Sequence, residues 1–254
     1  SGHATKIILD KNLSSYDAIL ILGGDGTVHE VINGMINNKF IINLPLGVIP
    51  TGSGNSLIHD LGEFDIQTIL NNILNHNIHA IDVLKITNND RIYYSINLVG
   101  WGMGTDIGIL AEKMRWMGPV RYNVASIIKI FTYKPKQATL VIDENEINTK
   151  IALLTVCNTI HIGKGMKMAP NAKLNDGKMD IIFIEDNLST LELIKLFPTI
   201  FSGNHIKNSK VNYIKANSFK LISQKDGILN IDGELKGSTP ITIDVLKSKI
   251  RILN

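Results

Sequence analysis

The chain has 254 residues, 44% of them hydrophobic and 19% charged, so it can bury one large core or two modest ones. Its 26 Lys and Arg residues against 23 Asp and Glu residues give a formal charge of +3, which is too small to indicate a nucleic-acid partner, and none is expected. The single cysteine, Cys157, excludes an internal disulfide framework and is expected to be a small core residue in a reducing compartment.

Hydropathy gives no sign of a membrane-spanning segment. No stretch reaches the roughly 18 consecutive apolar residues of such a helix. The first residues, SGHATKIILDKN, lack the long apolar segment of a secretory signal. We therefore expect a soluble, cytoplasmic protein whose membrane contact is peripheral, and a homodimer is left open.

The first third of the chain alternates strands and helices. Apolar runs at 16–22 and 46–50 predict strands, and apolar residues three and four positions apart predict a helix over 28–36. This alternation predicts a parallel sheet covered on both faces. Two more helices are expected, one opening at Ser53 or Asn55 and one at Asp65.

From about residue 79 the pattern changes to that of antiparallel strands. Between 92 and 98, apolar side chains recur at every second position, as in a half-buried strand. The division predicts an α/β lobe over residues 1–78 and a β-rich lobe over residues 79–254. Helices are expected to interrupt the second lobe near 105–116, 119–132 and 189–201.

A cluster of glycines around an aspartate follows the first strand. The glycines of Gly-Gly-Asp-Gly-Thr at 23–27 let backbone N–H groups approach an anion, and the next helix points its positive end at the same place. Phosphate is the natural ligand of such a turn. Asp25 would repel it, and therefore fits a site that also holds Mg²⁺ or moves a proton. The alternative is a plain turn in which Asp25 caps the helix.

A second glycine turn, PTGSGNSL at 50–57, follows the next strand. Two such turns at adjacent strand ends of a parallel sheet are expected to face one crevice, where folds of this class bind ligands. The chain has no Walker A sequence and no complete G-x-G-x-x-G, so the predicted phosphate site is of another kind. His29 and Glu30 begin an H-E-x-x-H zinc motif, but Asn33 excludes it.

These two turns resemble the catalytic domain of the diacylglycerol and sphingosine lipid kinase family. The resemblance continues through WGMGTDIGILAEKMRWMGPVRY, NTIHIGKGMKMAPNAKLNDGKMDIIFI and NIDGELKGSTPITI, in the family's order. It implies a Rossmann-like α/β nucleotide lobe, as in NAD kinases and diacylglycerol kinases, followed by a C-terminal β-sandwich lobe. It also implies ATP- and Mg²⁺-dependent transfer of the γ-phosphoryl group to the hydroxyl of a membrane lipid: diacylglycerol, a sphingoid base or ceramide.

The resemblance further implies roles for individual residues. The catalytic base is Asp25 or Asp232, and the choice is left open. Asp106 is implied to contact the acceptor, and Asp176 to be a ligand of a structural magnesium ion, although an Asp-Gly pair is also a common turn. The implied nucleotide-binding residues are Gly24, Asp25, Gly26, Thr27, Glu30, Gly52, Ser53, Arg115, Arg121, Gly233 and Glu234.

Two departures from the family pattern limit these expectations. The strand, turn, helix and second strand with which family members usually begin have no counterpart here, so the nucleotide lobe is expected to be incomplete. Gly108 stands where sphingosine kinases carry an aspartate that contacts the amino-alcohol head, which weakens that assignment. The alternatives are an NAD kinase, which shares Gly-Gly-Asp-Gly-Thr, and a non-catalytic module that binds nucleotide or lipid.

Overall fold

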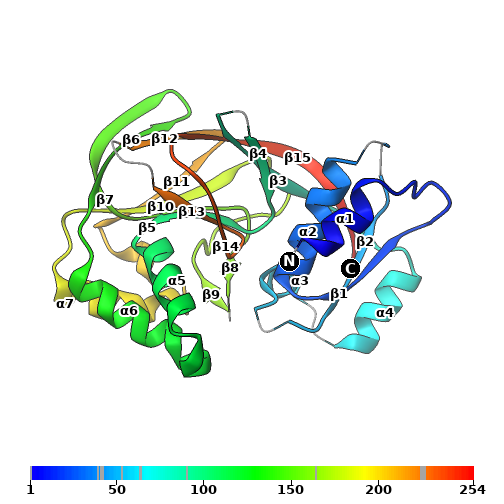
Figure 1. The fold of residues 1–254 in the computed structure, drawn as a ribbon, viewed down its shortest axis with the longest axis horizontal. Helices are drawn as coiled ribbons and strands as arrows, with labels where there is room; N and C mark the ends of the chain where they lie inside the picture. The colour runs from blue at the N-terminus through cyan, green and yellow to red at the C-terminus, as the bar shows by residue number, and fades with distance from the viewer. Residues whose placement is uncertain are drawn as a thin grey trace.

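The structure, a computed structural model, describes residues 2–38, 40, 43–52, 54–62, 65–89, 91–163, 165–223 and 227–254. Its first lobe lies on the right in Figure 1, and the second, larger lobe lies on the left. The elements of the first lobe are α1 (His3–Leu9), β1 (Ile19–Gly23), α2 (Asp25–Ile36), β2 (Leu46–Pro50), α3 (Ser56–Leu61) and α4 (Ile66–Leu74).

The first lobe forms because its strands and helices bury one apolar face each. β1 and β2 are parallel, as predicted, and pair Ile19 with Leu46 and Gly23 with Pro50. The apolar stripe of α2, from Val28 to Met35, is buried against this sheet. The predicted cap at Asp65 is also confirmed, since its carboxylate accepts a hydrogen bond from the Thr68 N–H at the start of α4.

The second lobe is mostly antiparallel sheet with three α-helices, and Cys157 is buried in it as expected. Its strands are β3 (Ile78–Asn88), β4 (Arg91–Ser95), β5 (Leu98–Gly102), β6 (Lys136–Ile142), β7 (Asn145–Cys157), β8 (His161–Ile162), β9 (Met166–Lys167), β10 (Met179–Glu185), β11 (Val211–Ala216), β12 (Ser218–Ser223), β13 (Ile228–Ile231), β14 (Glu234–Ser238) and β15 (Ile241–Leu253). Its helices are α5 (Met103–Lys113), α6 (Arg121–Thr132) and α7 (Thr190–Leu196), with short 3-10 helices η1 (Arg115–Val120), η2 (Phe197–Ile200) and η3 (Asn204–Lys207). The predicted α/β lobe followed by a β lobe is therefore confirmed. Among the described residues, no helix combines the length and apolarity needed to cross a bilayer.

Two long strands join the lobes. β3 and β15 pair antiparallel along most of their length, and the end of β15 also pairs in parallel with β2, at Ile252 with Leu46. One end of this ribbon contributes to the core of the first lobe and the other end to that of the second. The division at residue 78 stays a prediction. In space, the C-terminal strand returns to the first lobe, as Figure 1 shows.

A buried carboxylate stabilises the point where this ribbon bends. The register of β15 against β3 shifts between Leu246 and Ile250. There Asp82, which is fully buried, accepts hydrogen bonds from the Ser248 N–H at 2.6 Å and from the Gly177 N–H at 2.7 Å. Backbone donors that are buried without an acceptor are costly, so Asp82 makes the bend and the adjoining turn energetically feasible.

Asp82→Asn is expected to lower the free energy of unfolding by about 2–3 kcal/mol, because an amide NH₂ would face one of two buried backbone donors. Asp143→Asn is the control at an exposed carboxylate. Its two backbone N–H donors share one oxygen, which an amide oxygen can replace, and a change of about 0.5 kcal/mol or less is expected. Urea denaturation of both variants measures the difference. Equal losses would contradict the role of burial at Asp82.

Candidate active site between the glycine turns

The two predicted glycine turns touch each other. The turn from β1 to α2 and the turn from β2 to α3 meet at Gly24 and Gly52, where a Cβ on Gly52 would lie 2.4 Å from the Gly24 Cα. A side chain at either position would collide with the opposite backbone. The Thr51 N–H also donates to the Gly23 carbonyl at 3.1 Å. Both turns therefore belong to one surface, and glycine is required there for close approach.

Asp25 lies between the two turns. Its carboxylate accepts hydrogen bonds from the Ser56 N–H at 2.7 Å and from the Ser56 hydroxyl at 3.2 Å, so it caps α3 rather than its own helix. A Cβ on Gly54 would lie 2.6 Å from the Asp25 Oδ2, which explains the glycine at that position. Asn55, predicted as a cap, occupies the N-cap position of α3 without a side-chain cap bond, and Ser53 lies outside the described residues.

The electrostatic environment of Asp25 raises its pKa. Burial is the largest cause, the hydrogen bonds from Ser56 oppose it, and the negative charge of Asp232 adds to it. A carboxylate with a raised pKa holds a proton more readily than an exposed aspartate does, which suits a group that accepts one during a reaction. Beside it, the Gly26 Cα faces open space, and Thr27 packs its side chain against Gly23.

Asp232 is held much more tightly than Asp25. Its carboxylate accepts one hydrogen bond from the Ser95 hydroxyl at 2.6 Å, three from the backbone N–H groups of residues 96–98 at 3.0 Å, and one from His29 Nδ1 at 2.7 Å. Burial alone would raise the pKa of Asp232, but His29 and these donors outweigh it and hold the pKa below its usual value. Asp232 is thus a structural anion that orders the β4–β5 turn and the His29 ring.

His29 connects the lobes and was not recognised as a site residue in the sequence. It lies on α2 one turn after Asp25, and its Nε2 is 2.6 Å from the Lys236 Nζ, which also donates to Glu234 at 2.9 Å. A lysine ammonium only donates, so Nε2 accepts and Nδ1 carries the proton given to Asp232. The only available signal was its place in the Gly-Gly-Asp-Gly-Thr-x-His motif.

The turn after Asp232 is a tight one. Gly233 has a φ of 92°, in the region that favours glycine, and its N–H donates to the Asn230 side chain at 2.8 Å. Glu234 follows, about one-third exposed and paired with Lys236. The three residues of the Asp-Gly-Glu segment therefore lie together against α2, while their predicted contact with a nucleotide stays a prediction.

Glu30 and Asp176 have partners away from this surface. Glu30 is five residues after Asp25, about 140° around the helix, and its carboxylate accepts the backbone N–H groups of Gly2 and Ala4 at 2.6 and 3.0 Å at the start of α1. Asp176 pairs with the Lys215 ammonium at 3.0 Å. A lysine therefore neutralises the carboxylate predicted to hold a structural magnesium ion, and both predicted roles remain untested.

The predicted arginines and Asp106 belong to the α5–α6 region, which Figure 1 shows on the opposite side of the molecule from α2 and α3. Arg115 and Arg121 both contact Glu112, at 2.5 and 3.5 Å. Asp106 lies between two lysines, 3.8 Å from Lys129 and 3.6 Å from Lys136. The arginines thus lie together, and the charge of Asp106 is balanced within the second lobe.

The described residues contain no cluster of three or more His, Cys, Asp or Glu side chains that could enclose a metal ion. Mg²⁺ in phosphoryl-transfer sites is commonly held by one or two carboxylates together with substrate phosphates and water. Asp25, the partly buried carboxylate between the two turns, could provide one oxygen ligand for such an ion or accept a proton, but it could not do both at once. The surface formed by the two glycine turns, here called the phosphate cradle, fits a phosphate group because glycine leaves the backbone accessible.

The relatives of this chain include a diacylglycerol kinase and a sphingosine kinase. A diacylglycerol kinase from Bacillus subtilis is 30% identical, and the match covers 94% of this chain and 78% of that protein. Sphingosine kinase 1 from Arabidopsis thaliana is 26% identical over 92% of this chain. The chain spans 59% of the length of that plant relative.

Solved structures share the fold over nearly the whole chain. A diacylglycerol kinase from Bacillus anthracis superposes with a TM-score of 0.72 at 21% identity, covering 100% of this chain and 81% of that chain. An NAD kinase from Archaeoglobus fulgidus in complex with ATP superposes with a TM-score of 0.51 at 14% identity, covering 97% and 81%. At these identities the likeness concerns the fold alone.

Two family domains account for most of the sequence. Residues 1–86 match the diacylglycerol kinase catalytic domain. Residues 97–254 match the YegS C-terminal NAD kinase beta sandwich-like domain. Together with the contact between the glycine turns, these matches show that the chain belongs to the diacylglycerol kinase and sphingosine kinase family.

Proposed function

We propose that this protein is a lipid kinase that transfers the γ-phosphoryl group of ATP to the hydroxyl of a membrane lipid. The observation that carries the proposal is the contact of the two glycine turns around Asp25. It places bare backbone, the N-terminus of the 12-residue helix α2 and one carboxylate on the same surface. Phosphoryl transfer needs mainly positioning and charge neutralisation, which these groups supply.

The roles of the chain's own residues follow from this arrangement. The first N–H groups of α2, at Asp25 and Gly26, have no partner within the helix and point toward the incoming phosphates. Gly24 and Gly52 keep that approach free of side chains. Mg²⁺, bound with ATP, would neutralise phosphate charge. Arg115 and Arg121, predicted to contact the ATP phosphates, are held by Glu112 in the α5–α6 region, away from the glycine turns, so the proposal assigns them no contact with phosphate.

Asp25 rather than Asp232 is the proposed base. Its carboxylate is only partly buried, its pKa is raised, and its contacts with Ser56 leave further acceptor positions open. Asp232 is fully buried, has five donors and a lowered pKa, so it is poorly suited to take a proton from a lipid hydroxyl. Its proposed role is to hold His29 and the β4–β5 turn in place.

The proposed acceptor has an uncharged head group. Asp106 is already balanced by Lys129 and Lys136, so it offers no free carboxylate to an ammonium group. A Cβ built on Gly108 would lie 3.8 Å from the Asn230 Nδ2, so the space beside this glycine faces the Asn230 amide. An amide donates hydrogen bonds to neutral hydroxyl and ester oxygens. This environment favours a diacylglycerol-like acceptor over a long-chain base.

Peripheral membrane contact is proposed for the exposed face of η1 and α6. Trp116, Val120, Ile127 and Phe131 have exposed fractions of 83%, 55%, 59% and 64%, and the last three recur at helical spacing. The exposed Arg115 beside them suits anionic lipid headgroups. The proposal places a cytoplasmic kinase on the surface of a membrane by this face, here called the α6 face.

Asp25→Asn is expected to lower kcat by about 10²-fold or more, because general-base catalysis typically contributes that much. Radiolabelled ATP is offered with diacylglycerol, long-chain bases, ceramide and NAD. Transfer of label to diacylglycerol is the expected result, and the Asp143→Asn control should transfer label at the wild-type rate. Label in NAD alone would identify an NAD kinase, and binding of ATP without transfer to any acceptor would indicate a non-catalytic module.

Ser56→Ala should move the acid limb of the kcat/KM profile to higher pH. The Ser56 hydroxyl lowers the pKa of Asp25, whose burial raises it, so loss of that hydroxyl raises the pKa further. A base works only when ionised, and activity therefore falls at a higher pH as the solution is acidified. Ser56→Thr keeps the hydroxyl and should restore the wild-type profile. An unmoved limb in Ser56→Ala would rule out Asp25 as the titrating base.

Replacing Trp116 and Phe131 together by Ser should weaken binding to phosphatidylcholine–phosphatidylglycerol vesicles by about tenfold or more, because each large apolar side chain contributes about 1.5–3 kcal/mol when buried. Turnover of a short-chain, water-soluble diacylglycerol should not change. Ile222→Ser on β12, a partly exposed apolar residue of another element, is the control. Vesicle flotation measures the effect, and equal binding of all variants would contradict the α6 face as the docking surface.

A further inference from the structure

A third glycine-containing segment reaches the same surface from the second lobe. β8 and β9 form a short hairpin in which His161 pairs with Lys167 and Ile162 with Met166. Figure 1 shows it extending from the second lobe toward α3. We name residues 161–163 and 165–167 the glycine hairpin, since Gly163 and Gly165 lie at its end. None of its residues was predicted to belong to the site.

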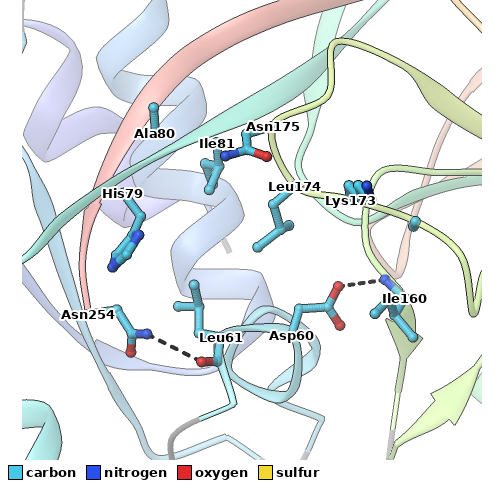
Figure 2. A pocket seen from close by; sticks show the side chains of 11 residues that line it. Asp60, Leu61, His79, Ala80, Ile81, Ile160, Lys173, Leu174, Asn175 and Asn254 are labelled. Carbon is cyan, nitrogen blue, oxygen red and sulfur yellow. Dashed lines mark hydrogen bonds between the residues drawn. The ribbon is translucent and has the colours of Figure 1, made fainter.

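Asp60, on α3, anchors the base of this hairpin. Its carboxylate is almost fully buried and accepts three hydrogen bonds: from the Ile160 N–H at 2.5 Å, the His161 N–H at 3.0 Å and His161 Nδ1 at 2.6 Å. Figure 2 shows the Asp60–Ile160 bond at the edge of a cavity of about 360 Å³. A buried carboxylate needs such donors, so this contact between the lobes is specific in geometry.

The residue before Asp60 supports the tip of the hairpin. The rings of His59 and His161 lie 5.2 Å apart. Gly165 lies over the same His59 ring, since a Cβ on that glycine would be 3.6 Å from the His59 Cε1. Two successive residues of α3 therefore fix both the base and the end of the glycine hairpin. The N-terminus of that same helix is capped by Asp25.

Gly163 lies beside Gly54 of the second glycine turn. A Cβ built on Gly54 would be 2.6 Å from the Asp25 Oδ2 and 3.9 Å from the Gly163 Cα, so Gly54 separates the two. Apart from its neighbours in the chain, no described residue has an atom within 4 Å of a Cβ built on Gly163. That side of its backbone is therefore open among the described residues, with Gly54 between it and the proposed base. Three backbone segments from two lobes border one surface.

We propose that the glycine hairpin is a third wall of the phosphate cradle, with the Gly163 backbone as an additional contact for ATP phosphates, and that Asp60 is the positioning residue that holds it there. The inference rests on the proposed function, because it assumes that the phosphates of ATP bind beside Asp25. Glycine is suited to this place because bare backbone approaches phosphate oxygens more closely than a residue with a side chain allows.

The test compares Gly163→Val with Gly104→Val. Both positions have room for the new side chain, since the nearest atom to a Cβ on Gly104 is 3.9 Å away and none lies within 4 Å at Gly163. Gly163→Val is expected to raise the Kd for ATP, measured by calorimetry, and the KM for ATP about tenfold or more, with the KM for lipid and the melting temperature unchanged. Gly104→Val should leave both ATP constants unchanged.

Asp60→Ala provides a second, independent arm. It should raise the KM for ATP several-fold with little change in the KM for lipid, whereas Asp143→Asn should change neither. If both Gly163→Val and Asp60→Ala bind ATP as the wild type does, the hairpin only connects the two lobes structurally. The inference then fails, while the proposed kinase function is unaffected. A wild-type chain that binds no ATP would overturn both the proposed function and this inference.

Discussion

The direct backbone contact between Gly24 and Gly52 is the constraint on which the rest of the site depends. It brings the N-terminus of α2 and the N-terminus of α3 together, and Asp25 then bridges them through Ser56. Any side chain at either glycine would separate the two turns and remove Asp25 from its cap. The carboxylate that caps the N-terminus of α3 is therefore also the proposed base, so one feature is relevant to both stability and the proposed function.

The two aspartates considered as candidate bases, Asp25 and Asp232, differ in the hydrogen-bond donors that the chain places around their carboxylates. Asp232 is surrounded by donors from the β4–β5 turn and by His29, so its negative charge is satisfied in the fold. Asp25 has its donors at the start of α3, and its partial burial raises its pKa. Other buried carboxylates with structural roles also accept several hydrogen bonds, two at Asp82 and three at Asp60, and burial raises the pKa of Asp60 as well.

The two lobes are joined by covalent and non-covalent connections of different kinds. The β3–β15 ribbon passes through both hydrophobic cores and therefore acts as a stiff connection. Among the described residues, polar contacts also connect the two lobes, including His29 with Asp232 and Asp60 with His161. Polar contacts with fixed geometry set the position of loops more specifically than apolar packing does, which suits the edges of a site.

Local pattern was enough to predict much of this protein, and tertiary contacts decided the remainder. The apolar periodicity of α2, the alternating strands and the glycine motifs depend on neighbouring residues, so the sequence by itself determined the lobes, the two turns and the family. The partners of Asp25, Asp232 and Asp60 lie 31, 203 and 101 positions away. Whether an aspartate becomes a base or a buried anchor depends on donors that such distant segments bring to it. Only the folded chain establishes those contacts, because hydrogen-bond geometry is set by the packing of whole elements and leaves no periodic signal in the sequence.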